Sequence, residues 1–339
     1  MVIRECFKFY PKQLVQTAGF IFDHLYEMQL EYRDNILTSF EACYMAANDF
    51  LRMGDKMEEI WSKYGELEDD RMSVLEDKVN LVLSLYVADA VYAAQKIHLY
   101  VFKDIEDAIS EEMFGKIWIE TPNSQIKVLV ATLKDFLLEA KNRLDKILCR
   151  KTIDALASAT SLFYVKHLLL KSKGRQHSIG QEQGLVRMLG DIQLMKDYFE
   201  TLVHDHPSIM RVVEIKFEML RRIHALLSLA SQYFQSSGRD EREVFLLYLN
   251  DFVIFLQGQL KSLSLTAAVS GALVHLVAPS VAQEVIQFVE EKEDDLLAEA
   301  PNVDDVNDHS RLRQTVPGLQ LNRELQKIME LPNAVLSHV

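Results

Sequence analysis

Apolar residues recur along most of the chain at the spacing of an α-helix. The clearest case covers residues 184–203, where one apolar stripe repeats every three or four residues. Its members are Leu185, Met188, Leu189, Ile192, Met195, Phe199 and Leu202. Charged residues such as Asp191 and Lys196 fall mostly off this stripe, as on the solvent-facing side of an amphipathic helix. The pattern predicts a helix that buries one face against neighbouring helices.

Comparable stripes predict further helices along the whole chain. Ser73 and Glu76 have the spacing of a capping box, so one helix is expected to begin there and to reach Tyr100. No segment shows sustained alternation of apolar and polar residues between turn signals, so strands are not predicted. The predicted helices cover residues 14–50 with a break at 32–35, 49–64, 73–100, 126–149, 153–171, 184–203, 209–234, 241–263 and 280–291. Helices joined by short loops predict an all-α protein of stacked antiparallel bundles.

Loop signals divide this series of helices into three regions. Pro122 stands in a loop with turn chemistry, and residues 172–183 contain two glycines and form the best internal linker. After Glu291 the chain becomes acidic and poor in apolar residues, which predicts disorder, and residues 319–331 form a short amphipathic piece. We therefore expect a first helical bundle over residues 1–122, a second over 123–265, and short helices with an acidic tail over 266–339.

The charge of the chain limits its partners. A formal net charge of −13 disfavours nucleic acid, because phosphate binding needs a basic surface. Basic residues are nevertheless dense between Lys134 and Arg222, and such a face suits an acidic protein surface or an anionic membrane. An ordinary solvated helix face is the alternative interpretation. The basic residues include Lys141, Arg143, Lys146, Arg150 and Lys151, followed by four that we predict to bind a partner, Lys166, Lys171, Lys173 and Arg175.

The composition favours long helices in a cytoplasmic protein. The 339 residues include only 12 glycines and 7 prolines, so few positions break a helix. The three cysteines lie far apart without a C-x-x-C pair, which favours reduced thiols. The N-terminus lacks the apolar core of a signal peptide, and the most apolar stretch, residues 263–278, is shorter than the ~20 residues of a membrane-spanning helix. No transmembrane helix is predicted.

The chain offers no recognisable catalytic motif. Neither a phosphate-binding glycine motif nor a G-x-S-x-G nucleophile motif occurs. His204 and His206 are the best candidates for metal ligands, but a site needs three or four converging ligands, and an ordinary polar turn also explains this pair. Arg150 would lower the pKa of a reactive Cys149, whereas a small core residue is the plainer interpretation of that cysteine. No enzyme, cofactor, metal or small-molecule substrate is predicted.

Four helical segments stand in an order that is also found in a known family. Residues 40–60 (FEACYMAANDFLRMGDKMEEI) contain an aliphatic–Ala–Ala–Asn core, and residues 130–136 (VATLKDF) are similar to a T-[VL]-x-D-[YF] segment. Residues 163–169 (FYVKHLL) share a tyrosine and the aliphatic positions after it, and residues 185–202 (LVRMLGDIQLMKDYFETL) are similar to a D-x-x-x-[LM]-x-x-[FY]-F helix. Over residues 20–235 the chain thus resembles exocyst complex component 3, the Sec-six subunit. The family's long N-terminal coiled-coil region is not found, which favours a C-terminal part or a shortened relative.

The resemblance implies an elongated rod of helical bundles of the tethering-complex, or CATCHR-like, type. It implies a non-enzymatic vesicle-tethering subunit in exocytosis, with other exocyst subunits and SNARE proteins as partners. Peripheral contact with an anionic membrane and a cytoplasmic location at the plasma membrane or at secretory vesicles are further expectations. Two other hypotheses fit the residues alone. One is a generic helical adaptor with different partners, and the other is an all-helical metal-dependent enzyme built on His204 and His206.

Overall fold

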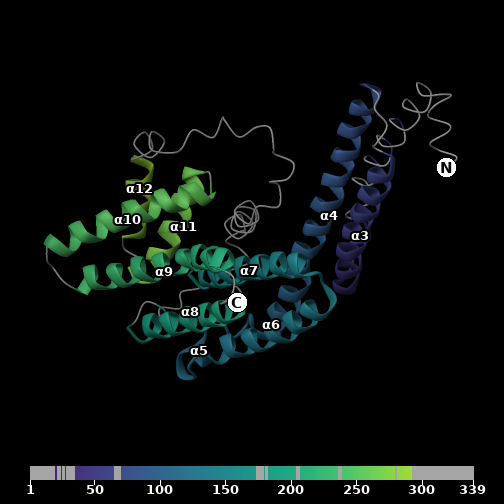
Figure 1. Cartoon of the computed structure of the whole chain (residues 1–339). Helices are drawn as coiled ribbons and strands as arrows, with labels where there is room; N and C mark the ends of the chain where they lie inside the picture. The colour runs from purple at the N-terminus through teal and green to yellow at the C-terminus, as the bar shows by residue number, and fades with distance from the viewer. Residues whose placement is uncertain are drawn as a thin grey trace. The chain divides into compact units, whose positions relative to one another are not determined.

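The structure of the chain is a computed structural model that describes residues 20, 24, 27, 35–64, 70–172, 179, 182–203, 207–235, 239–260, 262–278 and 281–291. Over these residues it contains helices and no strand, so the predicted all-α fold is confirmed. Figure 1 shows the helices coloured in chain order. They are α3 (Phe40–Tyr64), α4 (Asp70–Ile109), α5 (Lys116–Glu120), α6 (Ser124–Arg143), α7 (Lys146–Ser172), α8 (Glu182–Val203), α9 (Pro207–Gln235), α10 (Arg239–Leu260), α11 (Leu263–His275) and α12 (Ala282–Glu291).

Several helix ends differ from the prediction. The single helix predicted over residues 126–149 is wrong, because α6 ends at Arg143 and α7 begins at Lys146. A carboxylate oxygen of Asp145 accepts a hydrogen bond from the backbone N–H of Ile147 at 2.7 Å and so caps the start of α7. The apolar periodicity continues through this turn, since Leu144 and Leu148 are both buried. For this reason the hydrophobic pattern alone does not predict the turn.

Two other corrections concern the start of the described chain. α3 continues as one helix through the join predicted at residue 49, and α4 begins at Asp70, three residues before the predicted cap Ser73. Most of the helix predicted over residues 14–50 lies outside the described residues, as do the acidic tail and the amphipathic piece at 319–331.

The chain forms two compact units that alternate along the sequence. Unit 1 consists of Met1–Val101 and Phe136–Ile153, and unit 2 consists of Phe102–Asp135 and Asp154–Val339. Helices α4, α6 and α7 each supply residues to both units. The predicted boundaries at residues 122 and 265 stay predictions, and the second of them lies inside α11.

Small residues and long-range hydrogen bonds hold unit 1 together. A Cβ atom built on Gly54 of α3 would lie 3.7 Å from Cβ of Tyr86 in α4, so the two helices approach closely there. The hydroxyl of Tyr100 donates a hydrogen bond to the carbonyl oxygen of Leu37 at 2.6 Å. The hydroxyl of Thr152 in α7 reaches the carbonyl oxygen of Ala94 in α4 at 3.2 Å. The hydrogen bond of Thr152 fixes the start of α7 against α4.

Unit 2 is built from helices that pack on their neighbours in chain order. α8 packs on α9, α9 on α10, α10 on α11 and α11 on α12. The last pair approaches closely, because a Cβ on Gly271 would lie only 2.6 Å from Cγ1 of Ile286. Any larger residue at position 271 would have to displace the Ile286 side chain.

Helix α7 is, among the described helices, the one long and apolar enough to cross a membrane by length and composition. Of its apolar 18-residue window, 61% is buried inside the folded chain. Leu156, Tyr164 and Leu168 are among the buried side chains. Burial of this kind is typical of the core helix of a helical bundle.

Candidate binding surfaces

Two of the four predicted partner-binding residues can be placed, and one of them already has a partner. The ammonium group of Lys166 on α7 lies 2.5 Å from a carboxylate oxygen of Glu106, and its side chain is only 24% exposed. Lys171 is half-buried near the end of α7, whereas Lys173 and Arg175 lie outside the described residues. Lys166 is therefore less available to an outside partner than an exposed lysine. The prediction for this group of residues stays a prediction.

His167 does not add a second cation beside Lys166. Its ring is buried, and burial lowers its pKa to about 4, although Glu106 acts in the opposite direction. Its Nε2 atom lies 3.9 Å from the Glu106 carboxylate, but a neutral imidazole forms no ion pair at that distance. The ring instead packs against Phe163, with 4.3 Å between the ring centroids. Lys166 and Glu106 therefore form an ion pair that His167, as a neutral ring, does not join.

The turn between α6 and α7 forms an exposed basic surface of unit 1, which we call the α6–α7 corner (residues 138–151). It carries five cations, and Asp145 and Glu139 are the carboxylates in the same stretch. Burial raises the pKa of Cys149, and Lys141 and Arg150 both act in the opposite direction, so charges from two different helices lie near one thiol. The exposed cations are Lys141, Arg143, Lys146, Arg150 and Lys151.

Contacts from α3 hold the α6 side of the corner in place. The side-chain amide of Asn48 donates a hydrogen bond to the carbonyl oxygen of Arg143, the last residue of α6, at 2.7 Å. The guanidinium of Arg143 lies 6.0 Å from the centre of the Tyr44 ring and 2.8 Å from the carboxylate of Glu139. The end of α6 is thus fixed by a hydrogen bond from the Asn48 side chain and by a cation–π contact, and the charge of Arg143 is partly compensated by Glu139.

Two aliphatic side chains are exposed among these cations. Leu138 is 62% exposed and lies one helical turn before Lys141 on α6. Ile147 is 61% exposed and lies one turn before Arg150 and Lys151 on α7. Residues three or four positions apart share a helix face, so each aliphatic side chain lies in a row with the basic residues that follow it. The corner therefore combines positive charge with exposed apolar groups.

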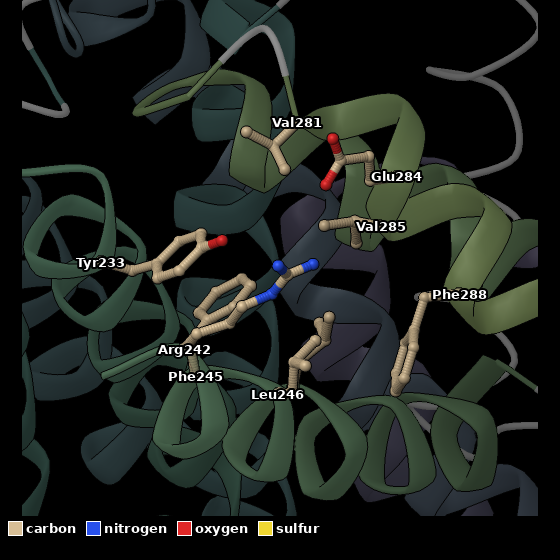
Figure 2. A pocket seen from close by; sticks show the side chains of 9 residues that line it. Tyr233, Arg242, Phe245, Leu246, Val281, Glu284, Val285 and Phe288 are labelled. Carbon is tan, nitrogen blue, oxygen red and sulfur yellow. The ribbon is translucent and has the colours of Figure 1, made fainter. Parts of the chain in front are cut away.

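Unit 2 has an apolar groove where α9, α10 and α12 meet (Figure 2). It is shallow and lined mainly by aromatic and aliphatic side chains. The rings of Tyr233 and Phe245 stack with 5.5 Å between their centroids. Figure 2 shows Arg242 directed from α10 towards α12, which carries Glu284. Arg242 and Glu284 are the charged groups among its lining residues, and the other lining side chains are apolar or aromatic. The groove is therefore a gap between packed helices.

A buried carboxylate lies inside unit 2, where the sequence pattern predicts a solvent-facing residue. Asp191 is fully buried, so the expectation that it lies off the apolar face of α8 is wrong. Its Oδ2 atom accepts hydrogen bonds from Nε1 of Trp118 at 2.6 Å and from the hydroxyl of Tyr164 at 3.1 Å. Burial raises the pKa of Asp191 to about 6, although these donors and Arg187 act in the opposite direction. The carboxylate joins α5, α7 and α8.

Of the candidates for chemistry named in the sequence analysis, Cys149 lies in the described part of the chain. Within it, no group of three or more His, Cys, Asp and Glu residues could hold a metal ion. His204 and His206 lie outside the described residues. Burial raises the pKa of Cys149 and outweighs the opposing effect of Lys141 and Arg150, so this thiol is not activated.

Comparisons with known proteins assign the family. The family model of the exocyst complex component Sec6 matches residues 1–236, well over half of the chain. The chain belongs to the Sec6 family. A solved structure of the C-terminal domain of the exocyst subunit Sec6p is also similar, with a TM-score of 0.62 and 14% sequence identity. That match covers 88% of this chain and 81% of the other, and at this identity it shows the fold. None of the curated proteins compared with the chain matches it.

The comparisons confirm two predictions that follow from the resemblance noted in the sequence. The resemblance over residues 20–235 agrees with the match over residues 1–236. As a Sec6 family member with the fold of an exocyst subunit, the chain is a tethering subunit of exocytosis. The matched family region ends before α10, whereas the structural likeness covers most of the chain.

Sequence reasoning found the five cations of the α6–α7 corner but missed the turn between the two helices, and it missed the burial of Asp191. The α6–α7 corner is hidden by a continuous apolar stripe, and its signal was Asp145, a good N-cap residue directly before Lys146. The buried position of Asp191 has no local signal, because its two hydrogen-bond donors lie 27 and 73 residues away in the chain. Only the packing of three helices reveals it.

Proposed function

We propose that this Sec6 family member acts as a non-enzymatic scaffold that binds other exocyst subunits through its helical surfaces. The observation that carries the proposal is the family match over residues 1–236 together with the helical fold. The ionisable groups inside unit 2 support it. Burial lowers the pKa of His167, and the carboxylate of Asp191 is held by Trp118 and Tyr164 within the packed interior.

SNARE proteins and an anionic membrane are the further partners that we propose. Both follow from the role of a tethering subunit, which has to bring a vesicle and its target membrane together. The location consistent with these contacts is the cytoplasmic side of secretion sites, peripheral to the plasma membrane or to the vesicle.

Co-purification from cells tests the scaffold proposal directly. The full chain, tagged at one end, is expected to recover other exocyst subunits in amounts comparable to its own, as measured by quantitative mass spectrometry. An unrelated helical protein with the same tag serves as the control. Recovery of a stable set of other proteins without exocyst subunits would instead identify the chain as a general helical adaptor and contradict the proposal.

A second measurement tests the SNARE contact separately. Purified full chain is mixed with a purified SNARE protein, and binding is followed by gel filtration or fluorescence anisotropy. We expect a complex that weakens as salt concentration rises, because charged surfaces contribute to the encounter. If exocyst subunits co-purify and no SNARE protein binds, the scaffold role stands and the SNARE proposal is wrong.

A further inference from the structure

The α6–α7 corner combines exposed cations with exposed aliphatic side chains on a chain that is acidic as a whole. Its cations lie at the ends of two helices, where Lys141, Lys146 and Lys151 are all exposed. The whole chain carries a net charge of −13, so its average surface is repelled by an anionic layer. At physiological salt, however, charges act over only about 8 Å, so a local basic surface is attracted independently of distant carboxylates.

The chemistry of the corner fits a lipid surface better than a protein surface. Lysine is depleted in protein–protein interfaces, whose energetic centres favour aromatic residues and arginine. The potential of an anionic membrane, in contrast, attracts any cation close to it and needs no fixed geometry. Arg143 is already held by Glu139 and Tyr44, which leaves lysines as most of the remaining exposed cations of the corner. Exposed aliphatic side chains beside such cations can enter the apolar boundary of a bilayer.

We propose that the α6–α7 corner is the docking surface of this chain for an anionic lipid bilayer. Lys141, Lys146 and Lys151 lie at the lipid headgroups, and Leu138 and Ile147 enter the interface between the headgroups and the acyl chains. The fixed end of α6, held by Asn48, presents these side chains without a change in the backbone. This inference rests on the membrane contact proposed above and assigns a site to it.

Vesicle binding by the full chain tests the assignment. The probe is phosphatidylcholine vesicles with or without phosphatidylserine, and the readout is co-sedimentation across a lipid titration. The test variant combines Lys141→Gln, Lys146→Gln and Lys151→Gln. The matched control combines Lys103→Gln, Lys127→Gln and Arg211→Gln, three exposed cations of unit 2. At about five-fold per cation, the test variant is expected to bind anionic vesicles about 100-fold more weakly, and the control about as well as the wild type.

A second variant separates the apolar contribution from the charge. Leu138→Ser combined with Ile147→Ser is expected to weaken binding about ten-fold, with the salt dependence retained. The matched control is Val244→Ser with Leu247→Ser, two exposed aliphatic residues of α10 in unit 2. Equal losses in both pairs would show that insertion at the corner does not occur and would overturn that part of the proposal.

Three results would overturn the assignment as a whole. The first is wild-type binding that does not depend on phosphatidylserine, and the second is a triple lysine variant that binds like the wild type. The third is a triple variant that keeps its vesicle binding but loses a protein partner, which would make the corner a site for an acidic protein. Co-purification of exocyst subunits is measured on the same variants. Its failure in the wild type counts against the scaffold role, and its retention alongside lost vesicle binding supports the assignment.

Discussion

The exposed corner of unit 1 and the enclosed polar groups of unit 2 use similar residue types in opposite ways. At the α6–α7 corner, Lys141 and Lys146 lie on the surface with their charges accessible. In unit 2, Lys166 is paired with Glu106, burial favours neutral His167, and Asp191 is enclosed by Trp118 and Tyr164. Burial thus decides whether an ionisable residue serves recognition or serves the fold. Substitutions of these enclosed or paired residues of unit 2 should therefore change stability, and substitutions of the corner lysines should change binding.

The largest expected effect follows from removing Trp118, whose ring is fully buried and donates to Asp191. Trp118→Ala leaves a large cavity and removes a hydrogen bond from a buried carboxylate. We expect the free energy of unfolding to fall by about 3–5 kcal/mol. Urea unfolding followed by circular dichroism measures this change. The control is Ile117→Ala, next to it in α5 but 48% exposed. Similar losses in the two variants would contradict the central place given to Trp118.

The next effect is the pH dependence created by Asp191. Its pKa of about 6 in the folded state lies above the ordinary value of 3.8, so the folded state binds the proton more tightly than the unfolded state. Asp191 therefore stabilises the fold at low pH, and this contribution is lost as pH rises from about 3.8 to 6. Asp191→Asn cannot ionise but keeps an acceptor for Trp118 and Tyr164. Its stability relative to the wild type should rise across this window by up to roughly 3 kcal/mol.

Unfolding titrations at several pH values measure this difference. Asp197→Asn on the exposed side of α8 is the matched control for removing a carboxylate from this helix. A flat difference for Asp191→Asn between pH 4 and pH 7 would mean that the Asp191 carboxylate is ionised in the folded state over the whole range.

His167 is expected to give a pH dependence of the opposite sign. Its folded pKa of about 4 lies below the ordinary value of 6.5, so the unfolded state binds the proton more tightly. The wild type therefore gains stability from this residue as pH rises from about 4 to 6.5, by up to roughly 3 kcal/mol. The stability of His167→Gln relative to the wild type should fall over the same window. The two pH ranges overlap, so the opposing contributions of Asp191 and His167 partly cancel in the stability of the wild type. Relative to the wild type, the stability of Asp191→Asn should rise with pH and that of His167→Gln should fall.

The smallest effect compares two lysines. Lys166→Gln breaks the pair with Glu106, which is partly exposed, and should lower the free energy of unfolding by about 0.5–1 kcal/mol. Lys141→Gln at the corner should change it by less than about 0.5 kcal/mol. Denaturant midpoints measured side by side test this difference. A larger loss for Lys141→Gln would show that the corner is held together by its charges.

The sequence predicts what depends on local periodicity and fails where distant residues decide. The stripe from Leu185 to Phe199 predicts α8 almost from end to end, because most of its side chains form the buried face, although Leu189 is 50% exposed. Asp191 lies on that helix and is buried, because Trp118 and Tyr164 donate hydrogen bonds to it. A hydrophobicity scale does not take such distant donors into account.

The candidate site shows the same limit. Both basic stretches of the chain look alike as sequence, and only the position of Glu106, 60 residues before Lys166, separates a paired lysine from an accessible one. Asp145 is a favourable N-cap residue and could have indicated the turn. The buried Leu144 and Leu148, however, continue the apolar periodicity across it. Hydrophobic patterns therefore predict the helices, and side-chain partners decide which surface is left for binding.

The alternation of the two units along the sequence limits how this protein can be rearranged. Each unit takes its residues from two separate stretches of the chain, and the changes from one unit to the other fall within α4, α6 and α7. Neither unit can be transplanted into another protein as one uninterrupted segment. A fusion protein that keeps the fold must contain both units. To express unit 1 alone, a new linker would have to join its part of α4 directly to its part of α6.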